Sequence, residues 1–120
     1  MALGHNVSIS SDVPSAPIDL IGPLLNVEIA MTLRDPFNDA SKPFPLSRKP
    51  ASLEEALKAV TIYPAAQQDM ADKIGSIEVG KYADLVVLDQ NILDVETSDI
   101  SGIKVLGTLM DGRFTHRDGI

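Results

Sequence analysis

The residue with the clearest chemical potential is Asp12. It follows Val7 to Ser10, whose alternation of apolar and polar residues predicts a short strand, and it precedes Pro14 and Pro17, which prevent regular pairing there. A carboxylate at the C-terminal end of a strand is well placed to bind a metal ion or move a proton, because the active face of an α/β barrel lies at those ends. The alternative is that Asp12 caps a turn through its side chain. The residues alone leave both interpretations open.

Few other groups could complete a site around this aspartate. His5 precedes the predicted strand and His116 lies near the end of the chain, without the H-x-H or H-E-x-x-H spacing of metal sites. A zinc centre normally needs three or four protein ligands. Arg34 closes a predicted helix, where a cation offsets the helix dipole, and its functional alternative is a substrate contact. The sequence therefore does not supply a complete catalytic constellation.

Composition excludes several other classes of function. The formal net charge is -7, which disfavours binding to nucleic acid. The absence of cysteine excludes disulfides, thiolate metal ligands and a cysteine nucleophile. There is no G-x-S-x-G elbow, no apolar run of the ~20 residues that a membrane span needs, and no pattern typical of a signal peptide. We therefore expect a cytoplasmic protein that neither crosses nor binds a membrane.

The first part of the chain is predicted to be helical. A helix is expected from Asp19 to about Arg34, with its regular part beginning near Pro23, because proline is tolerated in a first turn. Four prolines between residues 35 and 50 then predict a long loop. The expected apolar face of the helix consists of Ile21, Leu24, Leu25 and Ile29.

A capping box marks the start of a second helix. In Ser52-Leu53-Glu54-Glu55, the hydroxyl of Ser52 can accept from the backbone N–H of Glu55, whose carboxylate can accept from the N–H of Ser52. Pro64 is expected to end or kink this helix, and residues 65–70 to add a turn or a short second helix.

Strands are predicted after Gly75. The segment from Ala83 to Leu88 is expected to be a strand buried on both faces. A second strand is expected from Ile103 to Met110. Asp111-Gly112 predicts a type I′ turn, with Arg113 to His116 as the returning strand. Helices followed by strands indicate an α+β class with a boundary near residues 72–75, although an unrelated α+β interaction module would show the same pattern.

Several segments together resemble the amidohydrolase superfamily. The stretch from Ala71 to Asp89 is similar to the "iGsie-GK-ADlvvlD" signature of that family, and Leu53 to Ala66 resembles the helix that precedes it. Val105 to Phe114 resembles the closing hairpin, and Val7 to Pro14 the "SD-P" segment after the last barrel strand. The match runs in the expected order and resembles the branch that includes N-substituted formamide deformylases.

The resemblance implies a fold and a role for Asp12. Residues 1–72 would be the last strand and helices of a (β/α)8 metal-dependent hydrolase barrel, and residues 73–120 the C-terminal strands of the small β-sandwich domain. Asp12 would contact the metal, take a proton from metal-bound water and donate it to the leaving nitrogen. The parent enzyme would hydrolyse the C–N bond of a small amide or cyclic amide with a divalent metal ion, with zinc as the first candidate.

The family's other metal ligands have no counterpart here, which sets the expectations for the isolated chain. We expect it to bind no metal and to be inactive. Its exposed strand edges favour a homodimer or a segment-swapped oligomer. The alternative is a non-catalytic binding or regulatory domain that descends from such an enzyme.

Overall fold

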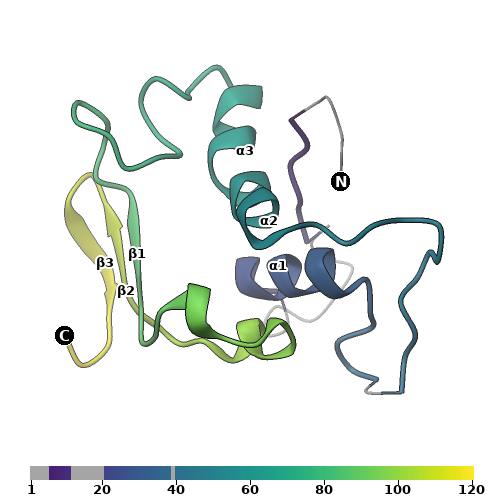
Figure 1. The fold of residues 1–120 in the computed structure, drawn as a ribbon. Coiled ribbons are helices and arrows are strands. Elements are labelled where there is room, and N and C mark those ends of the chain that lie inside the picture. Colours follow the sequence, from purple (N-terminus) through teal and green to yellow (C-terminus); the bar gives the residue numbers. More distant parts are fainter. Residues whose placement is uncertain (1–5, 12–20, 39) are drawn as a thin grey trace.

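The computed structural model describes residues 6–11, 21–38 and 40–120, and it shows an α+β chain (Figure 1). Helices lie on one side and an antiparallel sheet on the other, joined below by two 3₁₀ segments. The elements are, in order, α1 (Pro23–Thr32), α2 (Leu53–Val60), α3 (Ile62–Gln67), β1 (Leu85–Leu88), η2 (Ile92–Asp94), η3 (Thr97–Gly102), β2 (Val105–Met110) and β3 (Arg113–Arg117). No helix of the described residues is long and apolar enough to cross a membrane.

Helix α1 begins where the sequence predicts but ends earlier. Pro23 occupies the first turn, as expected. The helix stops at Thr32 because Leu33 adopts a left-handed conformation, with φ of 54°, and its N–H donates to the carbonyl of Ile29 at 2.8 Å. The predicted cap at Asp19 lies outside the described residues.

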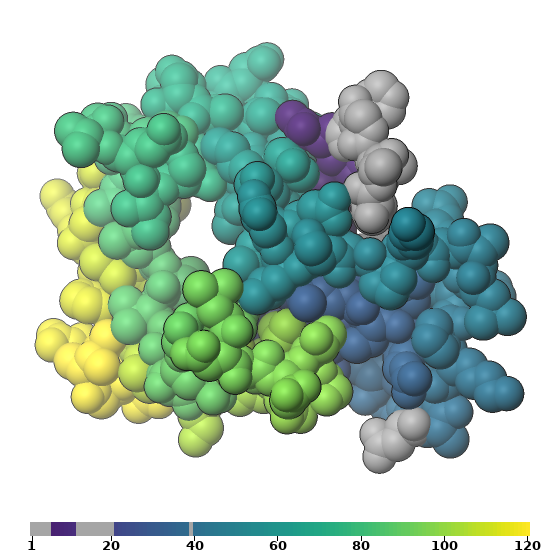
Figure 2. Space-filling model, viewed as in Figure 1, coloured from purple at the N-terminus to yellow at the C-terminus, as the bar shows by residue number. Residues whose placement is uncertain are grey.

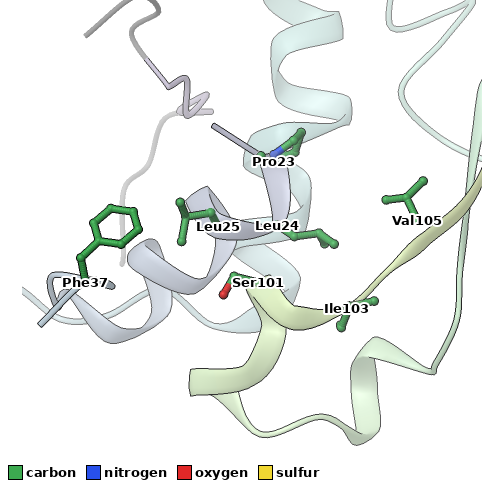
Figure 3. A pocket seen from close by; sticks show the side chains of 8 residues that line it. Pro23, Leu24, Leu25, Phe37, Ser101, Ile103 and Val105 are labelled. Carbon is green, nitrogen blue, oxygen red and sulfur yellow. The ribbon is translucent and has the colours of Figure 1, made fainter. Parts of the chain in front are cut away.

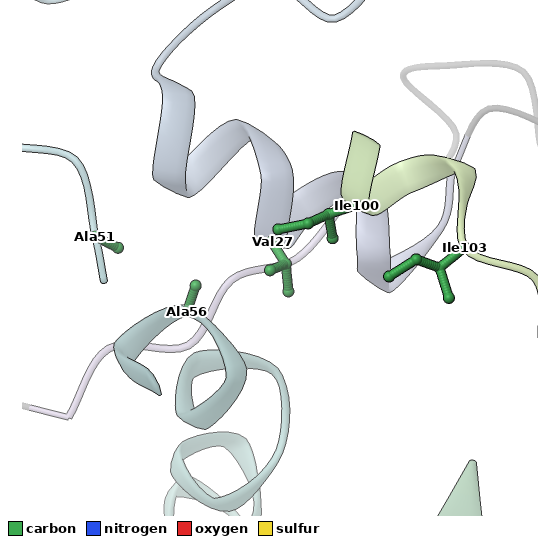
Figure 4. Packing of buried hydrophobic residues seen from close by; sticks show 5 residues of the cluster. All are labelled: Val27, Ala51, Ala56, Ile100 and Ile103. Atoms are coloured by element: carbon green, nitrogen blue, oxygen red, sulfur yellow. The ribbon is translucent and has the colours of Figure 1, made fainter. Parts of the chain in front are cut away.

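The prediction of which residues of α1 are buried was wrong for most of the face. The buried positions are Val27 and Glu28, and of the four predicted residues only Leu24 packs against the buried cluster. The physical reason is that α1 carries apolar side chains around its whole circumference, so that periodicity does not select one face. The cluster comes from α1, from α2 and the residue before its cap, and from η3 and its end; it consists of Val27, Ala51, Ala56, Ile100 and Ile103 (Figure 4).

The capping box of α2 is confirmed. The hydroxyl of Ser52 accepts from the N–H of Glu55 at 3.2 Å, and the Glu55 carboxylate accepts from the N–H of Ser52 at 3.1 Å. The short second helix is also confirmed, but it begins at Ile62 and contains Pro64 in its first turn. Pro64 therefore belongs to the start of α3, where its missing N–H is harmless, and α2 ends before it at Val60.

The sheet has the order β1–β2–β3 and is antiparallel throughout. The turn between β2 and β3 has positive φ at both central residues, 50° at Asp111 and 76° at Gly112, which agrees with the predicted type I′ turn. The expectation that the first strand is buried on both faces was wrong. Strand β1 forms, but Val86 is 59% exposed, because no described element covers that side of the sheet.

The predicted strand over residues 7–10 does not form. Within the described chain no strand lies beside it, and the N–H of Ile9 donates instead to the carbonyl of Ala59 at 3.0 Å. Ile77 and Val79, which come before the first strand, lie outside any strand and are exposed. The long loop that follows α1 contains only turns and bends in its described part, as predicted.

Packing between the two sides is loose. Figure 2 shows an opening between the segment that leads into β1 and the helices α2 and α3. The radius of gyration is 15.0 Å, whereas a compact domain of 120 residues has about 13.6 Å. The predicted boundary between residues 72 and 73 stays a prediction, and the buried cluster contains side chains from both sides of it.

Candidate functional site

Residues 6–11, which precede Asp12, are held against the helices by specific bonds. The Ser8 hydroxyl donates to the side-chain oxygen of Gln67 at 2.7 Å, and the Gln67 amide donates to the carbonyl of Asn6 at 3.3 Å. With the bond from Ile9 to Ala59, these contacts fix the segment to α2 and α3. In Figure 1 this purple segment runs beside those helices. The segment is thus positioned by helices rather than by a neighbouring strand.

Helix α1 supplies the last contact before Asp12. The side-chain amide of Asn26 donates to the hydroxyl of Ser11 at 2.9 Å. Asp12 itself lies outside the described residues, so its predicted metal and proton-transfer roles stay predictions. The Asn26 contact was not foreseen from the sequence, because an asparagine inside a helical pattern carries no local signal for a partner 15 residues away.

Two hollows meet at this point. The first, here named the Ser11 groove, has a volume of about 390 Å³. It is lined by Ile9, Ser10, Ser11, Asn26, Ile29, Ala30, Leu33, Arg48 and Lys49. The second has about 300 Å³, shares Ile9, Ser10, Ser11 and Asn26, and extends to Pro23, Val60 and Pro64. Ser11 and Asn26, which are hydrogen-bonded to each other, therefore line both hollows.

Arg34 lies at a different place. Its side chain is exposed and lines a polar cavity of about 180 Å³. The other lining residues are Glu28, Thr32, Asp35, Pro36, Asn38, Ser41 and Ser98. The structure does not bring Arg34 into the Ser11 groove, although the preceding residue, Leu33, lines that groove. Its predicted contact with substrate stays a prediction.

The described residues do not assemble a metal centre. No group of three or more His, Asp or Glu side chains within residues 6–11, 21–38 and 40–120 could hold an ion. His116 is exposed on β3, with Nε2 3.3 Å from the carbonyl oxygen of Val105, and His5 lies outside the described part of the chain. The described side chains by themselves fall short of the three or four ligands that a zinc centre needs.

A third hollow of about 360 Å³ is mainly apolar (Figure 3). Leu24 and Leu25 of α1 line it together with Phe37, Ile103 and Val105. None of its lining side chains is charged or titratable. The hollow can bury apolar surface, but it offers no acid, base or nucleophile.

The signature segment after α3 is held by Lys81. Its ammonium donates to the carbonyl of Ala71 at 2.5 Å and to the hydroxyl of Ser76 at 2.6 Å, and it pairs with the Glu78 carboxylate at 2.6 Å. The hydrogen bond from Lys81, followed by that from Ser76, lowers the pKa of Glu78. The lysine of this signature therefore stabilises the loop between α3 and β1.

Gly75 has a steric reason to be glycine. Its φ is 90°, and a Cβ atom there would lie 2.8 Å from Cβ of Ala65 and 2.9 Å from Cα of Ile62. Both the backbone conformation and the close approach of α3 require the absence of a side chain. The resemblance identified this segment from its sequence, and the structure explains its glycine and lysine as architectural residues.

Comparisons with known proteins agree with this architecture. The sequence model of the amidohydrolase family matches residues 1–116. The chain is 42% identical over 59 residues to an N-substituted formamide deformylase of Arthrobacter pascens, covering 49% of this chain and 11% of that protein. It is 42% identical over 67 residues to an imidazolonepropionase of Thermoplasma acidophilum, covering 55% of this chain and 16% of the relative.

A solved structure is similar over most of the chain. The crystal structure of an amidohydrolase from Thermotoga maritima MSB8 superposes with a TM-score of 0.62 and 28% sequence identity. The match covers 92% of this chain and 22% of the other. The chain thus spans 11% and 16% of the two curated relatives and about a fifth of the structural neighbour.

Proposed function

Since the chain belongs to the amidohydrolase family, we propose that it is part of a longer hydrolase that cleaves the C–N bond of a small amide or cyclic amide. The family match runs over residues 1–116, whereas the chain covers only a small share of each relative. In this proposal, residues 1–72 are the last strand and helices of the catalytic (β/α)8 barrel. Residues 73–120 are strands of the accompanying β-sandwich.

The exposed apolar surface supports this assignment. Helix α1 has apolar side chains spread around its axis, of which Val27 is buried, and the sheet exposes Val86, Met110 and Phe114. Further barrel and sandwich elements would cover both surfaces. In the isolated chain, a second copy or a swapped segment would take their place, since exposed strand edges pair readily.

Asp12 is the proposed proton-handling residue. The observation that carries this role is the fixation of residues 6–11 by all three helices, ending at the bond between Asn26 and Ser11 between two hollows. In hydrolysis, water adds across the C–N bond: the carbon gains the hydroxyl and the nitrogen leaves with a proton. Asp12 takes the proton of the attacking water and passes it to the leaving nitrogen.

A divalent metal ion, with zinc as the first candidate, belongs to the proposal for the longer protein only. Such an ion polarises the reacting carbonyl and lowers the pKa of water. The described residues do not provide a ligand set for it. Asp12 would be one ligand, and the others would come from outside this chain. The isolated chain should therefore be inactive.

Arg34 is proposed as a substrate contact of secondary weight. It shares its cavity with Asn38, Ser41 and Ser98, whose polar groups suit the polar end of a substrate.

A graft tests the catalytic proposal. The matching segment of the Arthrobacter pascens deformylase is replaced by this chain, and release of formate from N-substituted formamides is measured. The graft should be active, and Asp12→Asn should lower kcat at least about 100-fold, the range of a lost general acid–base group. Asp118→Asn, an exposed change near the C-terminus, is the matched control.

The graft also separates the alternative. A folded graft that is inactive with Asp12 in place would favour a non-catalytic binding or regulatory domain. Full activity of the Asp12→Asn graft would contradict the assigned role.

A further inference from the structure

The Ser11 groove combines an apolar wall with a cationic rim. Ile9, Ile29 and Leu33 form apolar lining, and Arg48 and Lys49 line the same hollow. The chain has a formal net charge of -7, so two adjacent cations in one hollow are opposite in sign to the charge of the chain as a whole. Neither cation forms an ion pair with an acid of the described residues.

The segment that carries the two cations is tied to the last turn of α1 and to the residue that follows it. The N–H of Phe44 donates to the carbonyl of Leu33 at 2.7 Å, and the N–H of Ala51 donates to the carbonyl of Ala30 at 2.9 Å. A further bond from the N–H of Arg48 to the carbonyl of Pro45, at 3.0 Å, closes the turn before Lys49. The cations are therefore held beside the apolar wall by backbone bonds.

The volume and the lining of the Ser11 groove together indicate the kind of ligand that would fit it. A hollow of about 390 Å³ lies in the range of small-molecule sites. Its apolar wall suits an aliphatic chain, and a guanidinium next to an ammonium suits a carboxylate, which arginine can bind through two parallel hydrogen bonds. Ser10, Ser11 and Asn26 supply polar groups elsewhere in the lining.

We propose that the Ser11 groove binds a small anionic amphiphile, an aliphatic chain that ends in a carboxylate. The aliphatic part lies against Ile29 and Leu33, and the carboxylate contacts Arg48 and Lys49. Binding of the amphiphile by this chain does not depend on catalysis.

The test uses the 120-residue chain labelled with ¹⁵N and titrated with sodium octanoate at constant ionic strength. Saturable amide shifts are expected at Ser10, Ile29, Leu33 and Lys49. The double variant Arg48→Gln and Lys49→Gln should weaken octanoate binding about five- to tenfold, which is about 1–1.4 kcal/mol, because exposed ion pairs contribute little each. Octanol, which has the same chain length without the charge, should bind both proteins equally.

A second double variant controls for net charge. Lys42→Gln and Arg113→Gln remove two exposed cations outside the groove and should leave octanoate affinity unchanged. Inorganic phosphate should cause no saturable shift in the groove, because it lacks the apolar part. Far-UV circular dichroism checks that both double variants remain folded.

Three results would overturn the proposal. The shifts could centre on Leu25, Phe37 and Val105, which line the uncharged hollow of Figure 3. The two double variants could bind octanoate equally. The shifts could instead follow protein dilution, which would place a second copy in the groove. Octanoate binding in the chain together with an inactive graft would reject the proposed function alone.

Discussion

The helical side and the sheet of this chain reach very different degrees of packing. Helices α1 and α2 enclose fully buried side chains together with η3, where Ile100 is 1% exposed. In the sheet, the buried position is Gly107, while Val86, Met110 and Phe114 are exposed. The helices and η3 share a hydrophobic core, whereas the hydrogen-bonded ladder holds the sheet together and leaves apolar surface uncovered. Among the described residues, none covers these apolar side chains of the sheet.

The largest test of this contrast is a matched pair of truncations. Ile100→Ala removes a fully buried side chain and should lower the free energy of unfolding by about 2–5 kcal/mol. Val86→Ala removes an exposed one and should change it by less than about 0.5 kcal/mol. Urea denaturation followed by circular dichroism measures both.

The same pair reports on oligomers. If Val86→Ala proves as destabilising as Ile100→Ala, and its effect grows with protein concentration, then a second copy covers the sheet in solution. Equal effects at every concentration would instead contradict the contrast itself.

The second test addresses the loop that joins the two sides. Gly75→Ala places a Cβ atom 2.8 Å from Ala65 and forces a residue other than glycine to φ of 90°. Strain and overcrowding together should destabilise the protein by about 2–4 kcal/mol. Gly102→Ala is the matched control, because no neighbouring atom lies within 4 Å of where its Cβ atom would be and its φ lies outside the left-handed region. Thermal unfolding midpoints compare them, and equal midpoints would show that the loop yields around the added methyl group.

The third test concerns the link between α1 and η3. Glu28 is 8% exposed, and its carboxylate accepts from the N–H of Ser101 at 2.8 Å. Glu28→Ala leaves that donor unpaired and should lower stability by about 1–3 kcal/mol. Glu28→Gln keeps an acceptor oxygen and should lose less. Hydrogen exchange at Ser101 should accelerate in the alanine variant, and an unchanged rate would show that the bond does not hold η3 in place.

The sequence predicted correctly those structural features that depend only on residues close by in the chain. The capping box at Ser52, the proline at the start of α1 and the turn at Asp111-Gly112 depend on near neighbours, so the sequence was sufficient for them. The predictions of burial failed where burial depends on the element that packs against the residue. The all-round apolar surface of α1 did not reveal that Val27 faces the core, and the apolar run of β1 did not reveal that Val86 would be exposed.

The candidate site follows the same division. The position of Asp12 after an apolar segment and the family signature were visible in the sequence, whereas the contact from Asn26 to Ser11 joins residues 15 positions apart. The Ser11 groove brings Arg48 and Lys49 to Ile9 across some 40 residues of sequence. No local pattern reports such contacts, because the fold of the loop between α1 and α2 creates them.

The smallest expected effect lies on the helical side and depends on pH. The hydrogen bond from the backbone of Ser52 lowers the pKa of Glu55. A carboxyl whose pKa is lower in the folded state stabilises the fold above its unfolded pKa, about 4.3. That contribution is lost as the pH falls through the folded pKa. Urea midpoints should therefore fall less steeply between pH 6 and pH 3 for Glu55→Gln than for the parent chain. The control is Glu96→Gln, a change in the loop before η3, which should fall as steeply as the parent chain. Identical slopes for all three proteins would mean that the capping box forms equally with a protonated Glu55, and that the stability of α2 comes from packing of Ala56 rather than from its charged cap.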